Sequence, residues 1–274
     1  MKPFSRTQIV RGYEVDASRT TPLPVMLSFL EQLRWEWIAD PAWGLAEGIH
    51  HGHFFVVRQQ ILEMVERPRF GDALTITGAL EKVGRSLVHV RHILSIDGRH
   101  VGHARVQGVW LGPDRKLARI PPLARQIGRE QGASLGPMSI CGADEDAILH
   151  GDSERSFLDA PRHLYRARGL ELTPPRALDV PISAAVKVRP SDCDVFNHVN
   201  ASQYLRYFDD ARIALGHTGM LQRVGLYYPA EALSGDELTI RIQPNGDELY
   251  GVLERDGTLL CGAVLGTIPT RTDR

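Results

Sequence analysis

Two carboxylates and one histidine lie close together in the C-terminal half of the sequence: Asp192, Asp194 and His198. Carboxylate and imidazole side chains are the groups that most often accept or donate protons in enzymatic hydrolysis. Taken singly, each of these residues would more often cap a helix or stabilise a turn. Their clustering between a predicted strand and a predicted helix favours a site of acid–base chemistry.

The elements around these residues would present them at the mouth of a helix. Residues 186–189 alternate between apolar and polar side chains, as in a strand, and residues 190–197 carry the Pro, Ser, Asp and Asn of turns and caps. Apolar side chains then recur at helical spacing: Ala201, Tyr204, Leu205, Phe208, Ala211 and Leu215. Because the first N–H groups of a helix are unpaired and its N-terminus is positive, a developing oxyanion would be stabilised there.

Composition indicates an ordinary globular protein and excludes several classes. Apolar residues make up 43% and charged residues 24% of the 274-residue chain, as in soluble globular proteins. The 32 basic and 33 acidic residues nearly balance, so we expect no nucleic-acid surface and no membrane insertion. Apolar runs such as Phe54–Val57 are far shorter than the ~20 residues that span a bilayer. The N-terminus lacks the apolar core of a signal peptide, so we expect a cytoplasmic location.

Neither cysteine nor histidine usage predicts a metal or a cofactor. Cys141, Cys193 and Cys261 are widely spaced without a CxxC pair, which indicates free thiols in a reducing compartment. His50 and His53 flank a third histidine, but no carboxylate or cysteine stands at ligand spacing. We therefore expect no metal and no cofactor.

The chain reads as two copies of one unit. A helix predicted over 25–38, stopped by Pro41 and Gly44, is followed by several strands with short turns, which is an α+β pattern. The sequence GDALTI at 71–76 returns as GDELTI at 235–240, a self-similarity that indicates a repeated supersecondary unit. A Gly-, Pro- and charge-rich segment lies between the copies. The predicted organisation is an N-terminal unit, a linker and a C-terminal unit over 1–125, 126–180 and 181–274.

The two copies differ chemically at the predicted helix mouth. Where the second copy has Asp194 and His198-Val199-Asn200, the first has Asp16 and Thr20-Thr21-Pro22. Without a histidine, the first copy lacks the group that would exchange protons. We therefore expect one working centre, in the second copy.

The run DCDVFNHVN over 192–200, followed by YLRYF, resembles the signature of hot-dog-fold thioesterases. The fuller run RPSDCDVFNHVN is most similar to the catalytic segment of the acyl-ACP thioesterases of plants and bacteria. This resemblance implies a tandem (double) hot-dog fold, with two long central helices each wrapped by an antiparallel sheet. It also implies a hydrolase of fatty acid biosynthesis that converts fatty acyl-ACP to free fatty acid and carrier thiol. In that family the first unit shapes the acyl pocket, for which Met26, Leu30 and Trp37 are the expected lining residues.

The resemblance assigns roles to individual residues. It carries the family's Asp onto Asp194, its His onto His198 and its Glu onto Glu231. Glu231 would act as general base on water, His198 would orient or share the proton, and Asp194 would bind the histidine or the water. Substrate contacts are expected from four residues of the same segment: Phe196, Asn197, Val199 and Asn200. Backbone N–H groups near Val199 and Asn200 would hold the thioester oxygen.

The chain departs from the family at two positions. Phe196 stands in place of an asparagine, and Ala232 in place of the cysteine after the glutamate. The lost cysteine argues against a thiolate mechanism unless Cys193 replaces it. Two flanking aspartates would raise the pKa of the Cys193 thiol and weaken it as a nucleophile, so we interpret it as structural.

Other readings remain open. The alternatives to acyl-ACP hydrolysis are an acyl-CoA thioesterase of the same fold and a non-catalytic acyl-binding protein. A hot-dog hydratase is suggested faintly by Gly52-His53-Phe54, and a GxSxG nucleophile elbow by Gly132–Gly136, although this run lacks the strand that such an elbow requires.

The expected partner is the thioester substrate on acyl carrier protein or coenzyme A. Because acyl carrier protein is acidic, a cluster of arginines is expected to dock it: Arg119, Arg125, Arg162, Arg166 and Arg168. A homodimer is a further possibility that the sequence leaves open.

Overall fold

A strand, a helix and four further strands follow one another twice along the chain. The computed structural model describes residues 4–134 and 178–268, here called the first and the second copy. The first copy contains β1 (Phe4–Ile9), α1 (Leu23–Ala39), β2 (Phe54–Met64), β3 (Ala73–Val83), β4 (Leu87–Ile96) and β5 (Arg99–Leu111). The second contains β6 (Ala184–Lys187), α6 (Ala201–Ala214), β7 (Met220–Tyr227), β8 (Glu237–Asn245), β9 (Glu248–Arg255) and β10 (Thr258–Ile268).

All ten strands form one antiparallel sheet in the order β1-β3-β4-β5-β2-β7-β10-β9-β8-β6. The order reads the same from either end when each strand is exchanged for its counterpart in the other copy. The copies join where β2 pairs with β7, with Gln59 opposite Tyr227 and Glu63 opposite Arg223. The expected α+β tandem hot-dog is therefore confirmed, with the two sheets fused edge to edge.

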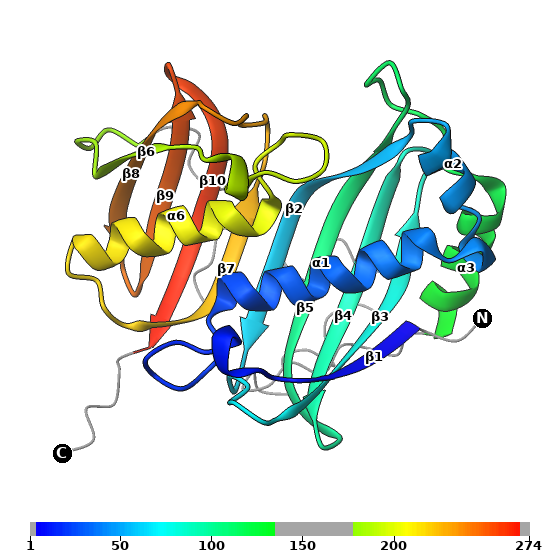
Figure 1. Cartoon of the computed structure of the whole chain (residues 1–274), viewed down its shortest axis with the longest axis horizontal. Helices are drawn as coiled ribbons and strands as arrows, with labels where there is room; N and C mark the ends of the chain where they lie inside the picture. Colours follow the sequence, from blue (N-terminus) through cyan, green and yellow to red (C-terminus); the bar gives the residue numbers. More distant parts are fainter. Residues whose placement is uncertain (1–3, 135–177, 269–274) are drawn as a thin grey trace.

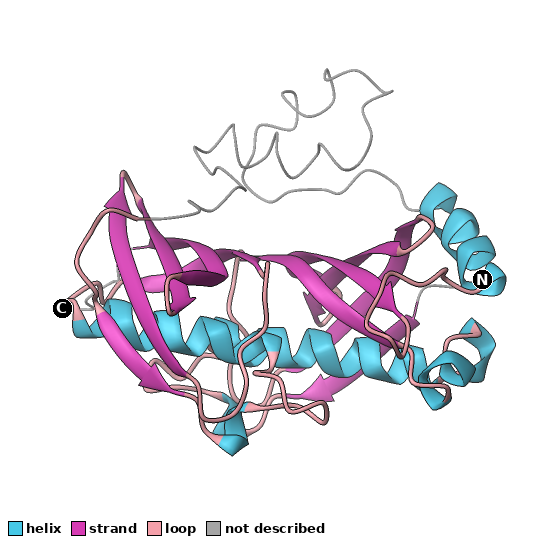
Figure 2. Cartoon of the chain, turned by 90° about the horizontal axis from the view of Figure 1, so that it is seen from above, coloured by secondary structure: helices cyan, strands magenta, loops and turns pink. Residues whose placement is uncertain are grey.

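Both long helices lie on the same face of this curved sheet, as Figures 1 and 2 show. Apolar side chains of α1 and α6 form a shared core, in which Leu30 and Phe208 are fully buried. Burial of a side chain of this size contributes roughly 1.5–3 kcal/mol. The helices also touch through a hydrogen bond between the Ser28 and Ser202 hydroxyls, 3.1 Å apart. This contact sets the start of α6 beside the middle of α1.

Residues at both ends of α1 explain where this helix begins and ends. Proline occupies its first turn, where a missing N–H costs no hydrogen bond. At its end the Asp40 carboxylate accepts a hydrogen bond from the N–H of Ala42 at 2.9 Å, and Gly44 adopts a left-handed φ of 65°. The helix predicted over 25–38 thus extends from 23 to 39.

An insertion distinguishes the first copy from the second. Equivalent positions differ by 178 residues at the helix starts (Leu23 and Ala201) but by 164 at the starts of β3 and β8, so the first copy has 178 − 164 = 14 more residues between them. These residues lengthen α1 and add η2 (Pro41–Trp43) and α2 (Ala46–His50). Three tryptophans gather around the insertion in a second apolar cluster, on which α3 packs: Trp37, Trp43 and Trp110.

Helix α3 (Pro122–Ser134) follows the last strand of the first copy and crosses the predicted domain boundary at residue 126. The Gln131 carboxamide accepts a hydrogen bond from the N–H of Leu80 at 2.9 Å, which fixes α3 to β3. The predicted boundaries 1–125, 126–180 and 181–274 stay predictions. Cys141 lies outside the described residues. Within the two described ranges no helix is long and apolar enough to cross a membrane.

Candidate active site

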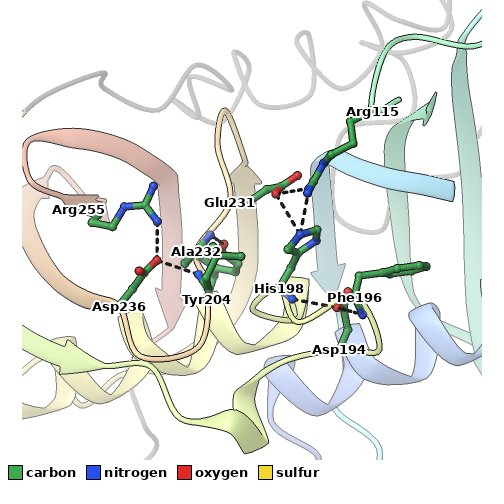
Figure 3. Close-up of polar contacts among 10 residues, drawn as sticks. Arg115, Asp194, Phe196, His198, Tyr204, Glu231, Ala232, Asp236 and Arg255 are labelled. Carbon is green, nitrogen blue, oxygen red and sulfur yellow. Dashed lines mark hydrogen bonds and ion pairs between the residues drawn. The ribbon is translucent and has the colours of Figure 1, made fainter. Parts of the chain in front are cut away.

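The segment before α6 forms a tight turn around the side chain of Asp194. Its carboxylate accepts hydrogen bonds from the N–H groups of Phe196 at 2.8 Å and His198 at 3.1 Å. Its carbonyl accepts one from Asn197, which adopts a left-handed φ of 62° that asparagine tolerates better than most residues. Asp194 was expected to bind the histidine or the water, and the contact in this structure is with the backbone N–H of His198 (Figure 3).

A short antiparallel bridge brings His198 and Glu231 together. His198 lies opposite Leu233, and the N–H of Val199 donates to the carbonyl of Ala232 at 2.9 Å. Because side chains two residues apart on an extended chain share a face, Glu231 lies on the same side as Leu233 and His198. The distance between His198 Nε2 and Glu231 Oε2 is 3.1 Å.

Arg115 is a third member of this cluster that sequence reasoning missed. It lies in the turn after β5, where its φ of 61° is left-handed. Its Nη2 is 2.5 Å from Glu231 Oε2 and 3.0 Å from His198 Nε2 (Figure 3). The run Gly-Pro-Asp-Arg-Lys predicts a turn, but no local signal shows that this turn reaches the second copy.

The cluster accommodates two protonation states of the histidine. A guanidinium only donates hydrogen bonds, so His198 Nε2 accepts one from Arg115 when Nε2 carries no proton. When Nε2 carries a proton, it donates to the Glu231 carboxylate. A residue that transfers protons requires partners in both states, and these two neighbours supply them.

Oxyanion donors were expected among the backbone N–H groups near Val199 and Asn200, and the N–H groups of these two residues are both engaged within the protein. The N–H of Val199 donates to the carbonyl of Ala232, and that of Asn200 donates to the carbonyl of Asp192, both at 2.9 Å. The next N–H along the chain, that of Ala201, has no acceptor among the described residues. Because it opens the positive end of α6, it is the N–H available to a developing negative charge.

Asn200 acts as the helix cap. Its side-chain oxygen accepts a hydrogen bond from the N–H of Ser202 at 2.9 Å. Its side-chain nitrogen donates to the Glu31 carboxylate of α1 at 2.8 Å. The cap therefore ties the start of the second helix to the middle of the first.

A cavity of about 800 Å³, here called the main cavity, opens beside the cluster. It takes its walls from α1, β2, the end of β5, the Asp194 turn and the loop after β7; its site residues include Arg115, Asp194, Phe196, His198, Val199, Ala201 and Glu231. Asn197 and Asn200, expected to contact substrate, are not part of this lining. The cavity therefore lies between the two copies, with the cluster on its wall.

Phe196 takes part in the aromatic wall of the main cavity. Its ring stacks on Trp35 of α1 at 6.3 Å between centroids and lies 5.5 Å from the ring of Phe54. The substitution for asparagine thus adds an apolar contact with the first copy. The expected lining residues Met26 and Leu30 are wrong, because both are fully buried in the helix–sheet core away from the cavities.

A second, small cavity of about 30 Å³ lies behind the first, and Trp37 lines it. Arg34, Ile38 and Phe55 border both cavities and separate them. The main cavity thus ends, inside the first copy, on a wall that contains one charged side chain.

No thiol stands in the site. Ala232 is fully buried, and its N–H donates to the Tyr204 hydroxyl at 3.0 Å. Burial raises the pKa of Tyr204, so this hydroxyl stays neutral. Burial, followed by the charges of Asp192 and Asp194, raises the pKa of the Cys193 thiol, which lies outside the lining of the main cavity. A thiolate mechanism therefore has no support here.

The other motifs lie away from the cluster. His53 stacks on Trp110 at 5.8 Å and does not line the main cavity, which removes the geometric basis for a hydratase. Residues 132–134 of the GxSxG run end α3 rather than following a strand, so they form no nucleophile elbow. The described ranges contain no group of His, Cys, Asp or Glu that could hold a metal ion.

The first copy retains the turn and lacks the chemistry. Asp16 accepts from the N–H of Ser18 at 2.8 Å, and Arg19 has a φ of 62°, which repeats the Asp194 turn. Thr20 occupies the place of His198 and pairs with Arg69 as His198 pairs with Leu233. The place of Glu231 is taken by Arg67, which lies 3.8 Å from Asp16. The first helix mouth therefore has neither the base nor the imidazole.

Comparison with known proteins agrees with this geometry. Residues 188–243, which contain the turn, α6 and Glu231, match the thioesterase-like superfamily. A comparison with curated proteins gives no match.

The whole chain is similar in structure to three solved proteins. An acyl-ACP thioesterase from Bacteroides thetaiotaomicron is 18% identical with a TM-score of 0.71, over 97% of this chain and 98% of that one. A putative oleoyl thioesterase from Lactobacillus plantarum is 18% identical with a TM-score of 0.71, over 98% and 97%. A 12:0-ACP thioesterase from Umbellularia californica is 16% identical with a TM-score of 0.69, over 98% of each chain. The resemblance seen in the sequence is thus confirmed for the fold over its full length.

Proposed function

We propose that this chain is a thioester hydrolase that converts fatty acyl thioesters, with acyl-ACP as the favoured substrate, to free fatty acid and carrier thiol. The observation that carries the proposal is the contact of His198 with Glu231 at 3.1 Å on the wall of an 800 Å³ cavity. A proton-transfer pair and a large pocket beside a helix N-terminus are the parts that thioester hydrolysis requires. The tandem hot-dog fold and the superfamily match support the same reaction.

The roles follow from the contacts. Glu231 accepts a proton from water through Oε1, because Arg115 and His198 occupy Oε2. The water oxygen attacks the carbonyl carbon, and the N–H of Ala201 stabilises the oxygen that becomes negative. When the carbon–sulfur bond breaks, the sulfur takes up the proton that Glu231 and His198 share. The hydroxyl of the water thus ends in the fatty acid, and its proton ends on the carrier thiol.

A group of arginines supports acyl carrier protein as the carrier. A hollow of about 380 Å³, here called the arginine hollow, is lined by Val83, Gly84, Arg85, Arg119, Pro122, Arg125 and Arg129. None of its four arginines forms an ion pair with another described residue, and no acidic side chain lines it. An acidic carrier protein matches this surface in charge.

The arginine hollow is close in sequence to Arg115 of the candidate active site. Arg119 is four positions after Arg115 in the chain, so their Cα atoms are at most about 14 Å apart. The other arginines expected to dock the carrier, Arg162, Arg166 and Arg168, lie outside the described residues. The cytoplasmic location and the homodimer stay predictions.

The proposal is tested by thiol release from acyl-ACP and acyl-CoA. Wild-type protein should release thiol from both and favour acyl-ACP, and Glu231→Gln should lower the rate by at least about 100-fold because it removes the general base. A preference for acyl-CoA would favour the acyl-CoA thioesterase of the same fold. Acyl binding without thiol release would leave the non-catalytic acyl-binding protein as the function.

A further inference from the structure

A buried arginine without a partner stands on the wall of the main cavity. Arg34 of α1 is 4% exposed and borders both the main and the small cavity. Its Nη1 is buried without a hydrogen-bond partner. Across the described parts of the chain, no residue forms an ion pair or a hydrogen bond with its guanidinium.

Arg34 differs in this respect from a comparable arginine of α6. Arg212 is also 4% exposed, and its guanidinium contacts the Asp209 carboxylate at 2.5 Å and the carbonyl of Gly219 at 2.7 Å. A buried charge without such partners is strongly destabilising. A bound molecule in the main cavity would supply the hydrogen-bond acceptors that the protein does not.

Glu31, one helical turn before Arg34, lines the same cavity. Its Oε1 accepts hydrogen bonds from Asn200 and from the Trp35 indole, at 2.8 Å and 3.3 Å. No described residue donates to its Oε2. The wall therefore presents donors from Arg34 and a free acceptor from Glu31 side by side.

One internal alternative is His92, which lies close enough for the charge of Arg34 to lower its pKa, after burial as the main cause. Its ring is fully buried, and both of its nitrogens lack a hydrogen bond. His92 therefore does not accept from Arg34. Because Arg34 lines the main cavity, an acceptor on a molecule bound there can reach its guanidinium.

We propose that the main cavity selects acyl groups that carry a hydroxyl oxygen, which accepts a hydrogen bond from Arg34 and donates one to Glu31. The inference rests on the proposed thioester hydrolysis and adds the class of acyl group to it. A saturated hydrocarbon chain would lie against a desolvated guanidinium and give it no acceptor. A carboxylate substituent would satisfy Arg34 but would meet the like charge of Glu31.

The test compares thioesters that differ only in oxygen. At the chain length that wild-type protein hydrolyses fastest, kcat/KM is measured for the plain acyl-CoA, its positional hydroxy derivatives and the mono-CoA thioester of the matching dicarboxylic acid. At least one hydroxyacyl-CoA should exceed the plain chain by about tenfold or more, as expected for a hydrogen bond from a charged donor. Arg34→Met should remove this preference, so that the hydroxyacyl and plain acyl substrates have similar kcat/KM values.

Two further arms separate the possible outcomes. Arg34→Gln keeps N–H donors without the charge, so it should retain part of a preference for hydroxyl and lose a preference for carboxylate. The inference is overturned if the carboxylate substrate is the fastest, if no hydroxyacyl-CoA exceeds the plain chain, or if Arg34→Met slows all substrates equally. In each of these cases the proposed hydrolysis itself still stands.

A binding measurement decides the inference if no thioester is hydrolysed. Calorimetric titration with hydroxy acids and the plain fatty acid then replaces kinetics. Tighter binding of a hydroxy acid that Arg34→Met abolishes supports the role of Arg34, although the hydrolase proposal has failed. Equal binding of the hydroxy acid and the plain fatty acid would overturn the role of Arg34 as well.

Discussion

Arg115 donates a hydrogen bond to Glu231, with 2.5 Å between Nη2 and Oε2, although the two residues belong to different copies of the repeated unit. The same nitrogen lies 3.0 Å from Nε2 of His198. The first copy thus supplies a charged group to the chemistry of the second. The tandem arrangement therefore provides part of the candidate site as well as walls of the main cavity.

Arg115→Ala is expected to lower kcat for acyl-CoA hydrolysis by about tenfold, because Glu231 loses the contact that orients its carboxylate. Steady-state kinetics measures the effect. The matched control is Lys116→Ala, whose side chain is 83% exposed and forms an ion pair with Asp114 of the same turn. Loss of activity in the control would mean that the turn itself, rather than the guanidinium, is responsible.

Charge reversal in the arginine hollow should lower the hydrolysis of acyl-ACP and leave the hydrolysis of acyl-CoA unchanged. Arg119→Glu with Arg125→Glu is expected to lower kcat/KM for acyl-ACP by at least about tenfold, since it replaces attraction by repulsion. Hydrolysis of acyl-CoA serves as the internal control and should not change. Raised salt should weaken acyl-ACP turnover by wild-type protein in the same direction. An equal loss with both substrates would contradict carrier docking here.

Asn200→Ala removes the cap of α6 and its hydrogen bond to Glu31. The free energy of unfolding should fall by about 1 kcal/mol, which lowers Tm by about 2–4 °C in a chain of this size. Differential scanning calorimetry measures the change. Arg206→Ala, at an exposed position of the same helix, is the control and should leave Tm nearly unchanged. A cap variant as stable as wild type would show that the N–H groups of α6 find other acceptors.

His89 of β4 should make the fold sensitive to acid. Burial, followed by the charges of Arg105 and Lys82, lowers the pKa of His89 from 6.5 to about 4. Between these pH values the unfolded chain binds a proton at His89 that the folded chain does not bind. The free energy of unfolding is therefore highest above pH 6.5 and falls as the pH is lowered towards 4. The loss is up to about 3 kcal/mol.

The comparison variant is His89→Leu, with urea unfolding followed from about pH 7.5 to pH 4.5. Differences in packing are removed by normalising each protein to its own stability at about pH 7.5. The variant should lose less stability than wild type over this range. Parallel pH profiles for the two proteins would contradict the assignment to His89.

The repeated unit could be predicted because its signals are local. The GD pairs at 71 and 235 mark the two turns before β3 and β8, where Gly71 and Gly235 adopt a φ of 90° that favours glycine. The apolar stripe of α6 indicated a helix that the structure places at Ala201–Ala214. The His198 position followed from the strand, turn and helix around it.

The cavity wall could not be predicted, because its contacts join residues far apart in the chain. Met26 and Leu30 have the apolar character of a lipid pocket, yet the helix turns them into the core. Arg34 lies on the same helix and borders the cavity instead. Oxyanion donors were expected near Val199 and Asn200, but the N–H groups of these two residues donate to the carbonyls of Ala232 and Asp192, which sequence spacing does not reveal.

The central claim is that one centre, at the start of α6, performs the hydrolysis, and its most direct test compares His198 with its counterpart Thr20. The rate of thiol release from an acyl thioester is measured for wild type, His198→Ala and Thr20→Ala under the same conditions. The account predicts a loss of at least about 100-fold for His198→Ala and a wild-type rate for Thr20→Ala. Hydrolysis at the wild-type rate by His198→Ala, in a folded protein, would contradict it.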